Sequence, residues 1–331
     1  MPDRPRVLVT RVLPGGDAPD SPLARLHAEA EVDVWPEDEP PSADALRAGA
    51  AEADGLLTML TERIDGDLLD AAPGVRAVAN MAVGYDNIDV AACTARRVLV
   101  TNTPGVLTDA TADMAFTLLL AAARRLLEGE RAVREGRWGA WHPTWLLGRD
   151  VSGSTLGVVG PGRIGHAVAE RARGFGMRVL YHGRREVPDF PGERAPLETL
   201  LAESHFVSMH VPLTEETAGM CDAGFFANMR PDAVFINTTR GGVVDQPALA
   251  RALRAGTIAA AGVDVTTPEP LPPEDPLLDS PRLVVAPHLG SATEQTRTKM
   301  AHLAVDGLLA ALRGERPAHL VNADAFEGAA R

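Results

Sequence analysis

Short apolar runs alternate with amphipathic, helix-like stretches along the first third of the chain. The strand-like runs lie at residues 7–10, 32–35, 55–60, 75–84 and 98–104, and the helix-like stretches lie at 21–30, 43–51, 68–73 and 88–97. This alternation predicts βαβ units and a parallel sheet. The Ala- and Leu-rich stretch that follows predicts one long connecting helix from about Thr108 to Arg134, which begins with an Asp/Thr cluster suited to capping.

A second series of apolar runs occupies the rest of the chain, at residues 155–160, 178–182, 206–212, 233–239, 260–265 and 283–288. These runs lack strict alternation, as strands covered on both faces require. A last helix, at about 293–313, is expected to return to the first lobe. The sequence therefore predicts an α/β fold with two Rossmann/flavodoxin-like, doubly wound parallel-sheet domains and an interdomain cleft. Residues 1–104 plus 292–331 would form a discontinuous substrate-binding domain, and residues 105–291 would form a dinucleotide-binding domain.

Composition and charge exclude several classes of function. The chain of 331 residues exceeds the size that one hydrophobic core usually serves, and its net charge of −13 argues against a nucleic-acid or anionic-membrane surface. Lys299 is the one lysine, so P-loop and Schiff-base chemistry have almost no candidates. Cys93 and Cys221 lie in no metal-binding or redox motif. Without a cleavable signal or a bilayer-length apolar run, the sequence predicts a cytoplasmic protein with no metal site.

A glycine-rich turn, Gly160-Pro161-Gly162-Arg163-Ile164-Gly165, fits GxGxxG directly after an apolar run and at the head of a helical stretch. In that context the motif predicts a dinucleotide site, with the pyrophosphate at the helix N-terminus. We expect Gly160 to permit the tight turn, Gly162 to let the backbone approach the pyrophosphate, and Gly165 to let helix and strand pack closely. A simple strand-to-helix turn is the alternative.

The residues at the end of the next predicted strand indicate whether the nucleotide is NAD(H) or NADP(H). An acidic residue there would bind the ribose 2′-hydroxyl of NAD, whereas this chain has His182, Gly183, Arg184 and Arg185. A guanidinium accepts a 2′-phosphate that a carboxylate would repel. The sequence therefore predicts NADP(H) in preference to NAD(H). The alternative is a solvated pair of loop arginines in a protein that binds NAD.

Three polar residues follow successive late strands: Arg240, Glu269 and His288. Ligands of open α/β sheets lie outside the carboxyl ends of the strands, so we expect these side chains in one crevice. Arg240 would bind the carboxylate of a 2-keto acid in a planar fork. His288 would protonate the carbonyl oxygen, and Glu269 would orient the imidazole and favour its protonated form. Each residue alone has a structural alternative, namely an ion pair, an exposed turn or a strand cap.

At this point the chain resembles the D-isomer-specific 2-hydroxyacid dehydrogenases, and most closely the glyoxylate/hydroxypyruvate reductases. The resemblance covers nearly the whole chain and rests on NMAVGYDNID (80–89), TNTPGVLTDATAD (101–113), WGAWHPTWLLG (138–148), VGPGRIG (159–165), NTTRGGVVD (237–245), GVDVTTPEPLP (262–272) and PHLGSAT (287–293). It implies NADPH-dependent reduction of glyoxylate and hydroxypyruvate to glycolate and D-glycerate, with Arg240, Glu269 and His288 in the roles given above.

The resemblance also implies the remaining contacts. The substrate would meet Leu60, Val83, Gly84 and Trp141, besides Arg240 and His288, and the Val83 and Gly84 amides would hold its carboxylate. The dinucleotide would meet, besides residues already named, Thr111, Val211, Pro212, Thr217, Thr238, Thr239, Asp264 and Gly290. The chain departs from the family pattern at Pro161, which removes one backbone donor, at Thr238 and Thr239, and at Gly242, where lysine is common.

The tryptophan-rich segment with Trp138, Trp141 and Trp145 has two interpretations. Aromatic clusters usually belong to a core or a subunit interface. In the resembling reductases the segment belongs to a dimer arm, from which a tryptophan would reach the neighbouring active site. The resemblance therefore implies a homodimer, in which Trp141 would restrict the pocket to short keto acids.

Other functions stay open at this stage. One is an NAD(H)-dependent D-2-hydroxyacid dehydrogenase for another small acid. Another is a dinucleotide-sensing scaffold like the C-terminal-binding-protein corepressors, since fold alone does not fix function. Formate dehydrogenase is disfavoured by Glu269, where that relative has glutamine, and a phosphoglycerate dehydrogenase with a regulatory extension would need more chain.

Overall fold

The computed structural model describes residues 4–16 and 18–327. The chain folds into two compact units. The first consists of the described residues up to Leu107 together with those from Thr293 onward, and the second of Thr108–Ala292. Among the described residues, no helix is both long and apolar enough to cross a membrane.

The first unit is built on a five-stranded parallel sheet. In sheet order, its strands are β2 (Glu31–Val34), β1 (Arg6–Val9), β3 (Gly55–Thr58), β4 (Ala77–Asn80) and β5 (Leu99–Thr101). This is the flavodoxin-like order, in which the connections reverse direction between β1 and β3. The central strands β3 and β4 are buried along their whole length, as a sheet covered on both faces requires.

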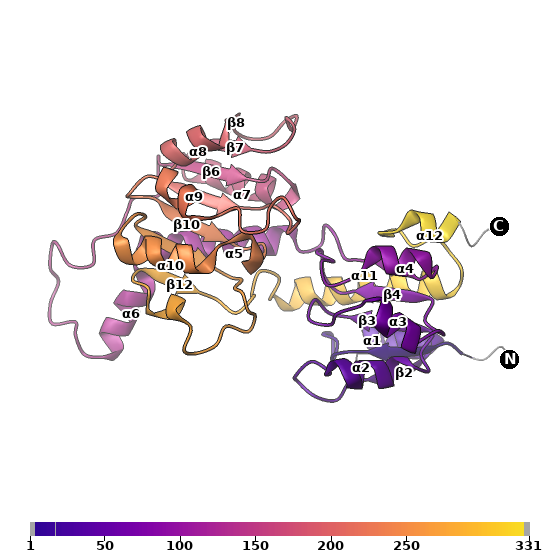
Figure 1. Ribbon diagram of the computed structural model, residues 1–331. Helices are drawn as coiled ribbons and strands as arrows, with labels where there is room; N and C mark the ends of the chain where they lie inside the picture. The colour runs from indigo at the N-terminus through magenta and orange to yellow at the C-terminus, as the bar shows by residue number, and fades with distance from the viewer. Residues whose placement is uncertain (1–3, 17, 328–331) are drawn as a thin grey trace. The chain divides into compact units, whose positions relative to one another are not determined.

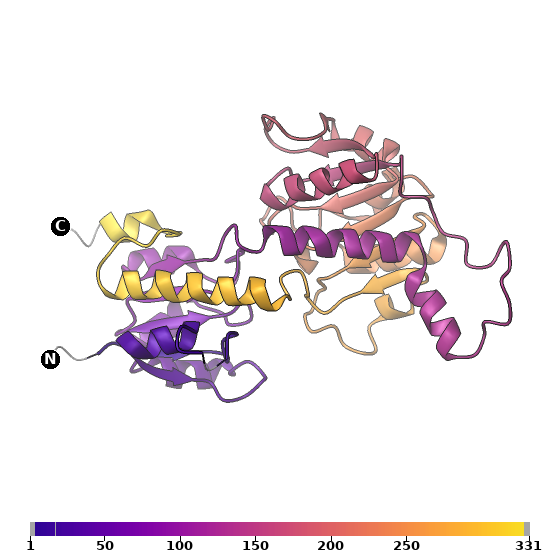
Figure 2. The same cartoon turned by 180° about the vertical axis from the view of Figure 1, so that it is seen from behind.

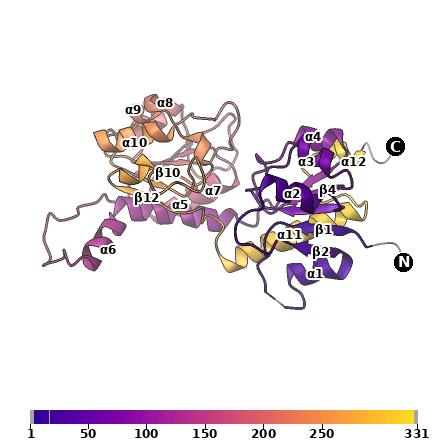
Figure 3. The same ribbon diagram turned by 60° about the horizontal axis from the view of Figure 1, so that its bottom comes forward.

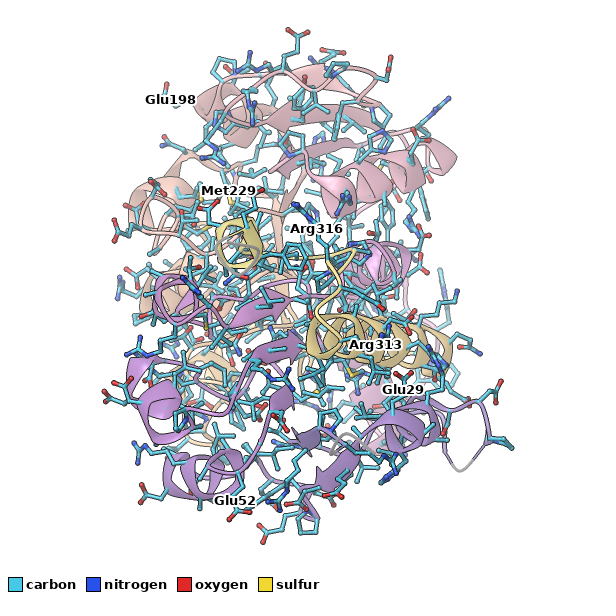
Figure 4. All side chains as sticks on the ribbon, turned by 90° about the vertical axis from the view of Figure 1, so that its right-hand side faces the viewer. Glu29, Glu52, Glu198, Met229, Arg313 and Arg316 are labelled. Carbon is cyan, nitrogen blue, oxygen red and sulfur yellow. The ribbon has the colours of Figure 1, made fainter. Side chains whose placement is uncertain are left out.

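Helices cover both faces of the first sheet. They are α1 (Pro22–Glu29), α2 (Ala43–Ala50), α3 (Gly66–Ala71), α4 (Val90–Ala95), α11 (Glu294–Leu312) and α12 (Ala323–Glu327). The last long helix, α11, packs on β3, β4 and β5 beside α1, as Figure 2 shows in yellow. Just after α11, Arg313 pairs with Glu29 at the end of α1 at 2.7 Å, and Figure 4 labels both side chains. The C-terminal part of the chain thus completes the first unit.

The second unit is built on a seven-stranded parallel sheet (Figure 1). In sheet order, its strands are β12 (Leu283–Val285), β11 (Ala260–Val263), β10 (Val234–Asn237), β9 (Phe206–Met209), β6 (Thr155–Val159), β7 (Arg178–His182) and β8 (Glu193–Arg194). The connections reverse direction between β6 and β9, which is where doubly wound folds bind ligands.

Each face of this sheet has its own apolar core. The helical elements are α5 (Thr108–Ala123), α6 (Leu126–Arg134), α7 (Arg163–Gly174), α8 (Leu197–Glu203), α9 (Ala223–Asn228), α10 (Gln246–Ala255), and the 3-10 turns η1 (Gly241–Val243) and η2 (Pro276–Asp279). Helices α5 and α7 lie side by side over one face, and α8, α9 and α10 cover the other (Figures 1 and 2). The predicted doubly wound fold class is confirmed.

The prediction of one continuous helix from Thr108 to Arg134 is wrong. The segment forms α5 and α6, which are separated at Arg125, where φ is +52°. The carbonyl of Ala123 accepts a hydrogen bond from the N–H of Arg149 at 2.8 Å instead of continuing the helix. Gly148 approaches the same carbonyl so closely that an added Cβ would lie 2.3 Å from its oxygen. A contact between distant segments therefore ends α5, and local helix propensity does not show it.

Helix α6 and the segment after it project away from the second sheet (Figure 3). Trp138, Trp141 and Trp145 in this segment are 59%, 82% and 39% exposed, so the interpretation of these residues as core of this chain is wrong. Leu126, Leu127, Val133 and Leu147 are also exposed there. We call α6 and the residues after it, as far as Leu147, the projecting segment. Its exposed apolar side chains form an extended surface of the kind that marks interaction sites.

Candidate active site

The glycine-rich turn adopts the geometry that a dinucleotide phosphate needs. It begins at Gly160, where φ is +100° and an added Cβ would lie 2.6 Å from the carbonyl group of His210. At Gly165 an added Cβ would lie 2.3 Å from the Gly160 oxygen, so only glycine allows α7 to pack against β6. Gly162 caps α7 without a side-chain hydrogen bond, and an added Cβ there would meet nothing within 4 Å. These residues fit a phosphate at the helix N-terminus.

The neighbouring turn after β7 packs against this site. The N–H of Gly160 donates to the His182 carbonyl at 2.9 Å, and an added Cβ on Gly183 would lie 2.6 Å from Cδ of Pro161. The proline thus lacks a backbone donor, and its ring lies so close to Gly183 that a side chain at position 183 would clash with it. Of the other predicted residues of this turn, Arg163 is exposed and Ile164 is half-buried at the start of α7.

Arg184 and Arg185 extend from the end of β7 into solvent. Within the part of the chain that the structure describes, neither side chain forms a hydrogen bond or an ion pair, so both guanidinium groups are available to an anion. The nearby Glu216 has a pKa below its ordinary range, chiefly because the Thr214 hydroxyl donates to it, with a smaller effect from the charge of Arg184.

A loop after β9 carries Val211, Pro212 and Thr217. The Thr217 hydroxyl donates to the Pro212 carbonyl at 2.6 Å and accepts from the Thr214 N–H at 2.8 Å. These bonds close the loop at the carboxyl edge of the sheet. Thr217 therefore has a role in holding the loop, in addition to any contact with a nucleotide.

Arg240 lies three residues beyond β10, and Asn237 holds it. The Asn237 side chain donates to the Arg240 carbonyl at 3.0 Å and accepts from the N–H and the hydroxyl of Thr239 at 3.0 and 2.7 Å. Nη1 of Arg240 donates to the Thr239 carbonyl at 2.9 Å. Thr238 is buried, and its hydroxyl has no hydrogen-bond partner among the described residues. The sequence prediction missed Asn237, although an asparagine at the end of an apolar strand-like run was a usable signal.

Asp264, directly after β11, organises the next turn along the edge. Its carboxylate accepts from the N–H groups of Leu289 and Gly290, both at 2.7 Å, and its carbonyl accepts from the His288 N–H at 2.8 Å. Burial raises the pKa of Asp264, while the two backbone hydrogen bonds lower it. An added Cβ on Gly290 would lie 3.2 Å from Oδ2 of Asp264 and 3.4 Å from Cγ2 of Thr111. The structure thus brings these predicted cofactor residues together.

Glu269 and His288 meet at the same edge. Oε1 of Glu269 lies 2.5 Å from Nδ1 of His288, and the two side chains are 34% and 24% exposed. His288 itself adopts a φ of +56°, in a turn that Asp264 fixes. Since β10, β11 and β12 are adjacent and parallel, Arg240, Glu269 and His288 all follow the carboxyl ends of neighbouring strands. The arrangement can offer an imidazole that a carboxylate orients, at the sheet edge that also carries Arg240.

The remaining predicted substrate contacts lie on other elements. Leu60 follows β3 in the first unit, and Val83 and Gly84 follow β4; all three are half-buried. Trp141 lies on the projecting segment of the second unit and is 82% exposed. Leu60, Val83 and Gly84 are therefore found at the carboxyl edge of the first sheet, whereas Trp141 lies on a segment that projects from the second sheet.

Comparison with known proteins agrees with this geometry. Residues 116–290 match the model of the D-isomer specific 2-hydroxyacid dehydrogenase, NAD binding domain. A glyoxylate reductase of Korarchaeum cryptofilum is 51% identical over 324 residues, which cover 96% of each chain. This chain belongs to the D-isomer-specific 2-hydroxyacid dehydrogenase family. As a member of that family, the protein is an oxidoreductase whose second unit binds a nicotinamide dinucleotide, and the family resemblance inferred from its motifs is confirmed.

Solved structures match both units of the chain. A Thermus thermophilus protein superposes with a TM-score of 0.90 and 47% identity, covering 96% of this chain and 99% of the other. An NADPH-dependent glyoxylate/hydroxypyruvate reductase of Sinorhizobium meliloti, in complex with NADP and malonate, gives a TM-score of 0.85 at 36% identity and covers 98% of each chain. The two-unit architecture of this 2-hydroxyacid dehydrogenase is therefore that of its family.

Proposed function

We propose that the protein catalyses the NADPH-dependent reduction of glyoxylate and hydroxypyruvate to glycolate and D-glycerate. The observation that supports this most directly is the His288–Glu269 pair, which lies at the sheet edge beside the turn that carries Arg240. The glyoxylate reductase of Korarchaeum cryptofilum and the Sinorhizobium meliloti reductase support the choice of substrates. When bound, NADPH supplies the hydride that reduces C2 of the keto acid.

In this proposal the side chains of the second unit bind the substrate and supply its proton. Arg240 binds the carboxylate of the keto acid through its planar guanidinium. Nδ1 of His288 faces Glu269, so Nε2 is the ring nitrogen that donates a proton to the carbonyl oxygen. Glu269 fixes the orientation of the ring through its contact with Nδ1. The family resemblance adds Leu60, Val83 and Gly84 as substrate contacts from the first unit.

The cofactor residues support NADPH over NADH. Gly160, Gly162 and the N-terminus of α7 would hold the pyrophosphate, and Arg184 and Arg185 would bind the 2′-phosphate with charge-assisted hydrogen bonds. Both arginines are exposed and have no ion-pair partner among the described residues, so no carboxylate has to be displaced. In the Arg184→Ala/Arg185→Ala double variant we expect the preference for NADPH to disappear while NADH activity is retained. Equal use of both cofactors by the wild type would instead favour the NAD(H)-dependent alternative.

The role of His288 can be tested with His288→Asn. We expect this variant to lose about 10²- to 10⁴-fold in kcat with glyoxylate, because it removes the proton donor. His302→Asn, which alters a histidine beside Arg25 in the first unit, is the control and should leave kcat unchanged. If the His288 variant kept most of the wild-type kcat, another group would have to supply the proton.

We also propose that the protein forms a homodimer through the projecting segment. Its exposed tryptophans and leucines would be covered by the same segment of a second copy, since exposed apolar surfaces of this kind mark interfaces. Sedimentation at micromolar concentration tests this, with a monomer as the contradicting result.

A further inference from the structure

Among the described residues, side chains hold the backbone of Val83 and Gly84 through the carbonyl groups alone. The Val83 carbonyl accepts from Nδ2 of Asn102 at 2.8 Å, and the Gly84 carbonyl accepts from Nδ2 of Asn80 at 2.9 Å. Within the described part of the chain, no group accepts a hydrogen bond from the N–H of either residue. Two carbonyls are thus fixed by side chains while two adjacent donors stay available to a ligand.

The neighbouring loop after β3 is fixed by a buried carboxylate. The side chain of Glu62 is fully buried, accepts from the Met59 N–H at 2.6 Å and from the Thr10 hydroxyl at 2.8 Å, and lies 3.5 Å from the Arg11 guanidinium. This loop carries Leu60. A buried carboxylate with several donors is a rigid anchor, because releasing any donor leaves charge unsatisfied.

Asn87 joins these two loops. Its Nδ2 donates to the carbonyls of Met59 and Glu62 at 3.1 and 2.8 Å, and its Oδ1 accepts from Nδ2 of Asn80 at 3.3 Å. Asn80 is fully buried and also accepts from the Thr58 hydroxyl at 3.3 Å. The chain of bonds therefore runs from the loop after β3, through Asn87 and Asn80, to the Gly84 carbonyl.

We propose that Asn87 and Asn80 are positioning residues of the substrate site. By tying the two loops to each other, they hold the N–H groups of Val83 and Gly84 in one geometry before the substrate arrives. Preorganised donors bind a carboxylate more tightly, because the cost of ordering the loop is already met in the folded protein. The inference rests on the proposed function, in which these amides bind the carboxylate of a 2-keto acid.

The test compares Asn87→Ala with a matched control, Asn322→Ala. Asn322 is also a buried asparagine of the first unit that bridges backbone groups: it accepts from the Val100 N–H and donates to the Val98 carbonyl, both at 2.8 Å. We expect both variants to unfold at lower temperature. Only Asn87→Ala should raise KM for glyoxylate, by about tenfold, with kcat and KM for NADPH unchanged, as loss of uniform substrate binding requires.

A second readout does not depend on turnover. Titration calorimetry with oxalate, a dicarboxylate that cannot be reduced, should show a similarly weakened affinity in Asn87→Ala and an unchanged affinity in Asn322→Ala. If Asn87→Ala does not fold, Asn102→Ala replaces it, because this half-buried residue releases only the Val83 carbonyl. A smaller rise in KM is then expected.

The outcomes separate the two proposals. A wild type that reduces neither glyoxylate nor hydroxypyruvate would overturn the proposed function. Turnover by the wild type, together with unchanged KM and oxalate affinity in Asn87→Ala, would overturn only the positioning role. Equal rises in KM in Asn87→Ala and Asn322→Ala would also overturn it, because both effects would then come from general destabilisation.

Discussion

Replacing Asp264 by asparagine should loosen the turn that carries His288. In the structure the two carboxylate oxygens of Asp264 accept from Leu289 and Gly290, each at 2.7 Å, and the side chain is buried. In Asp264→Asn one oxygen becomes an NH₂ group that faces a backbone donor. The variant therefore loses one hydrogen bond to a charged group, which is worth roughly 1.5–3 kcal/mol.

This loss acts on the stability of the second unit, Thr108–Ala292. For a domain of this size a change of 1 kcal/mol shifts the midpoint of thermal unfolding by about 2–4 °C. We therefore expect Asp264→Asn to lower Tm by roughly 3–12 °C. Circular dichroism without cofactor is the assay, because a contact between Asp264 and the nicotinamide then plays no part in the result.

The matched control is Asp222→Asn. Asp222 also accepts a backbone N–H, from Phe225 at 2.8 Å, as the N-cap of α9, and asparagine caps helices as well as aspartate does. This control should keep the wild-type Tm. If Asp264→Asn unfolded within about 1 °C of the wild type, below the smallest shift expected, the two hydrogen bonds would not hold the His288 turn.

Three further predictions concern the glycine-rich turn, a half-buried histidine and the projecting segment. Gly165→Ala should destabilise the second unit by about 1–3 kcal/mol, because its Cβ would lie 2.3 Å from a backbone carbonyl oxygen. Gly162→Ala should instead keep the wild-type Tm and lose dinucleotide affinity in a titration, because its Cβ would meet nothing within 4 Å. A lowered Tm in Gly162→Ala together with an unchanged Tm in Gly165→Ala would contradict the assigned roles. Burial lowers the pKa of His205 from 6.5, and its Nδ1 accepts a backbone N–H, so its contribution to stability is present above pH 6.5 and is lost as the pH falls. Urea unfolding should therefore show that the free energy of unfolding falls more steeply below that pH in the wild type than in His205→Gln. Equal slopes of the unfolding free energy against pH in the two proteins would show that His205 does not cause the loss. Trp141→Ala should relax the discrimination between glyoxylate and bulkier 2-keto acids, and unchanged kcat/KM ratios would show that Trp141 does not shape the pocket.

The sequence was sufficient to predict most of the sheet strands and the functional residues that follow their ends. The central strands are continuous apolar runs, and the glycines of the dinucleotide turn follow one of them directly, so pattern and motif agreed. The pairing of Glu269 with His288 was predicted from their order along late strands and from the family resemblance. These features are local, or are repeated from one parallel strand to the next.

Features that depend on contacts between distant segments could not be predicted from the sequence. The end of α5 depends on the Arg149 N–H, and the edge strand β8 is only two residues long. Asn80 at the end of a strand and Asn87 in a loop look like ordinary polar residues in the sequence, because nothing in their neighbourhood reveals that one side chain reaches Gly84 and the other reaches the loop after β3. Burial of a polar side chain is the informative signal, and it requires the structure.

The most direct test of the proposed function is the initial rate of cofactor oxidation by the wild type near neutral pH, with glyoxylate or hydroxypyruvate and with NADPH or NADH in parallel. We expect NADPH to be oxidised with both keto acids at rates well above those with NADH, and hydroxypyruvate to yield D-glycerate. Dinucleotide binding without turnover of either keto acid would contradict the proposed reaction and favour a dinucleotide-sensing scaffold.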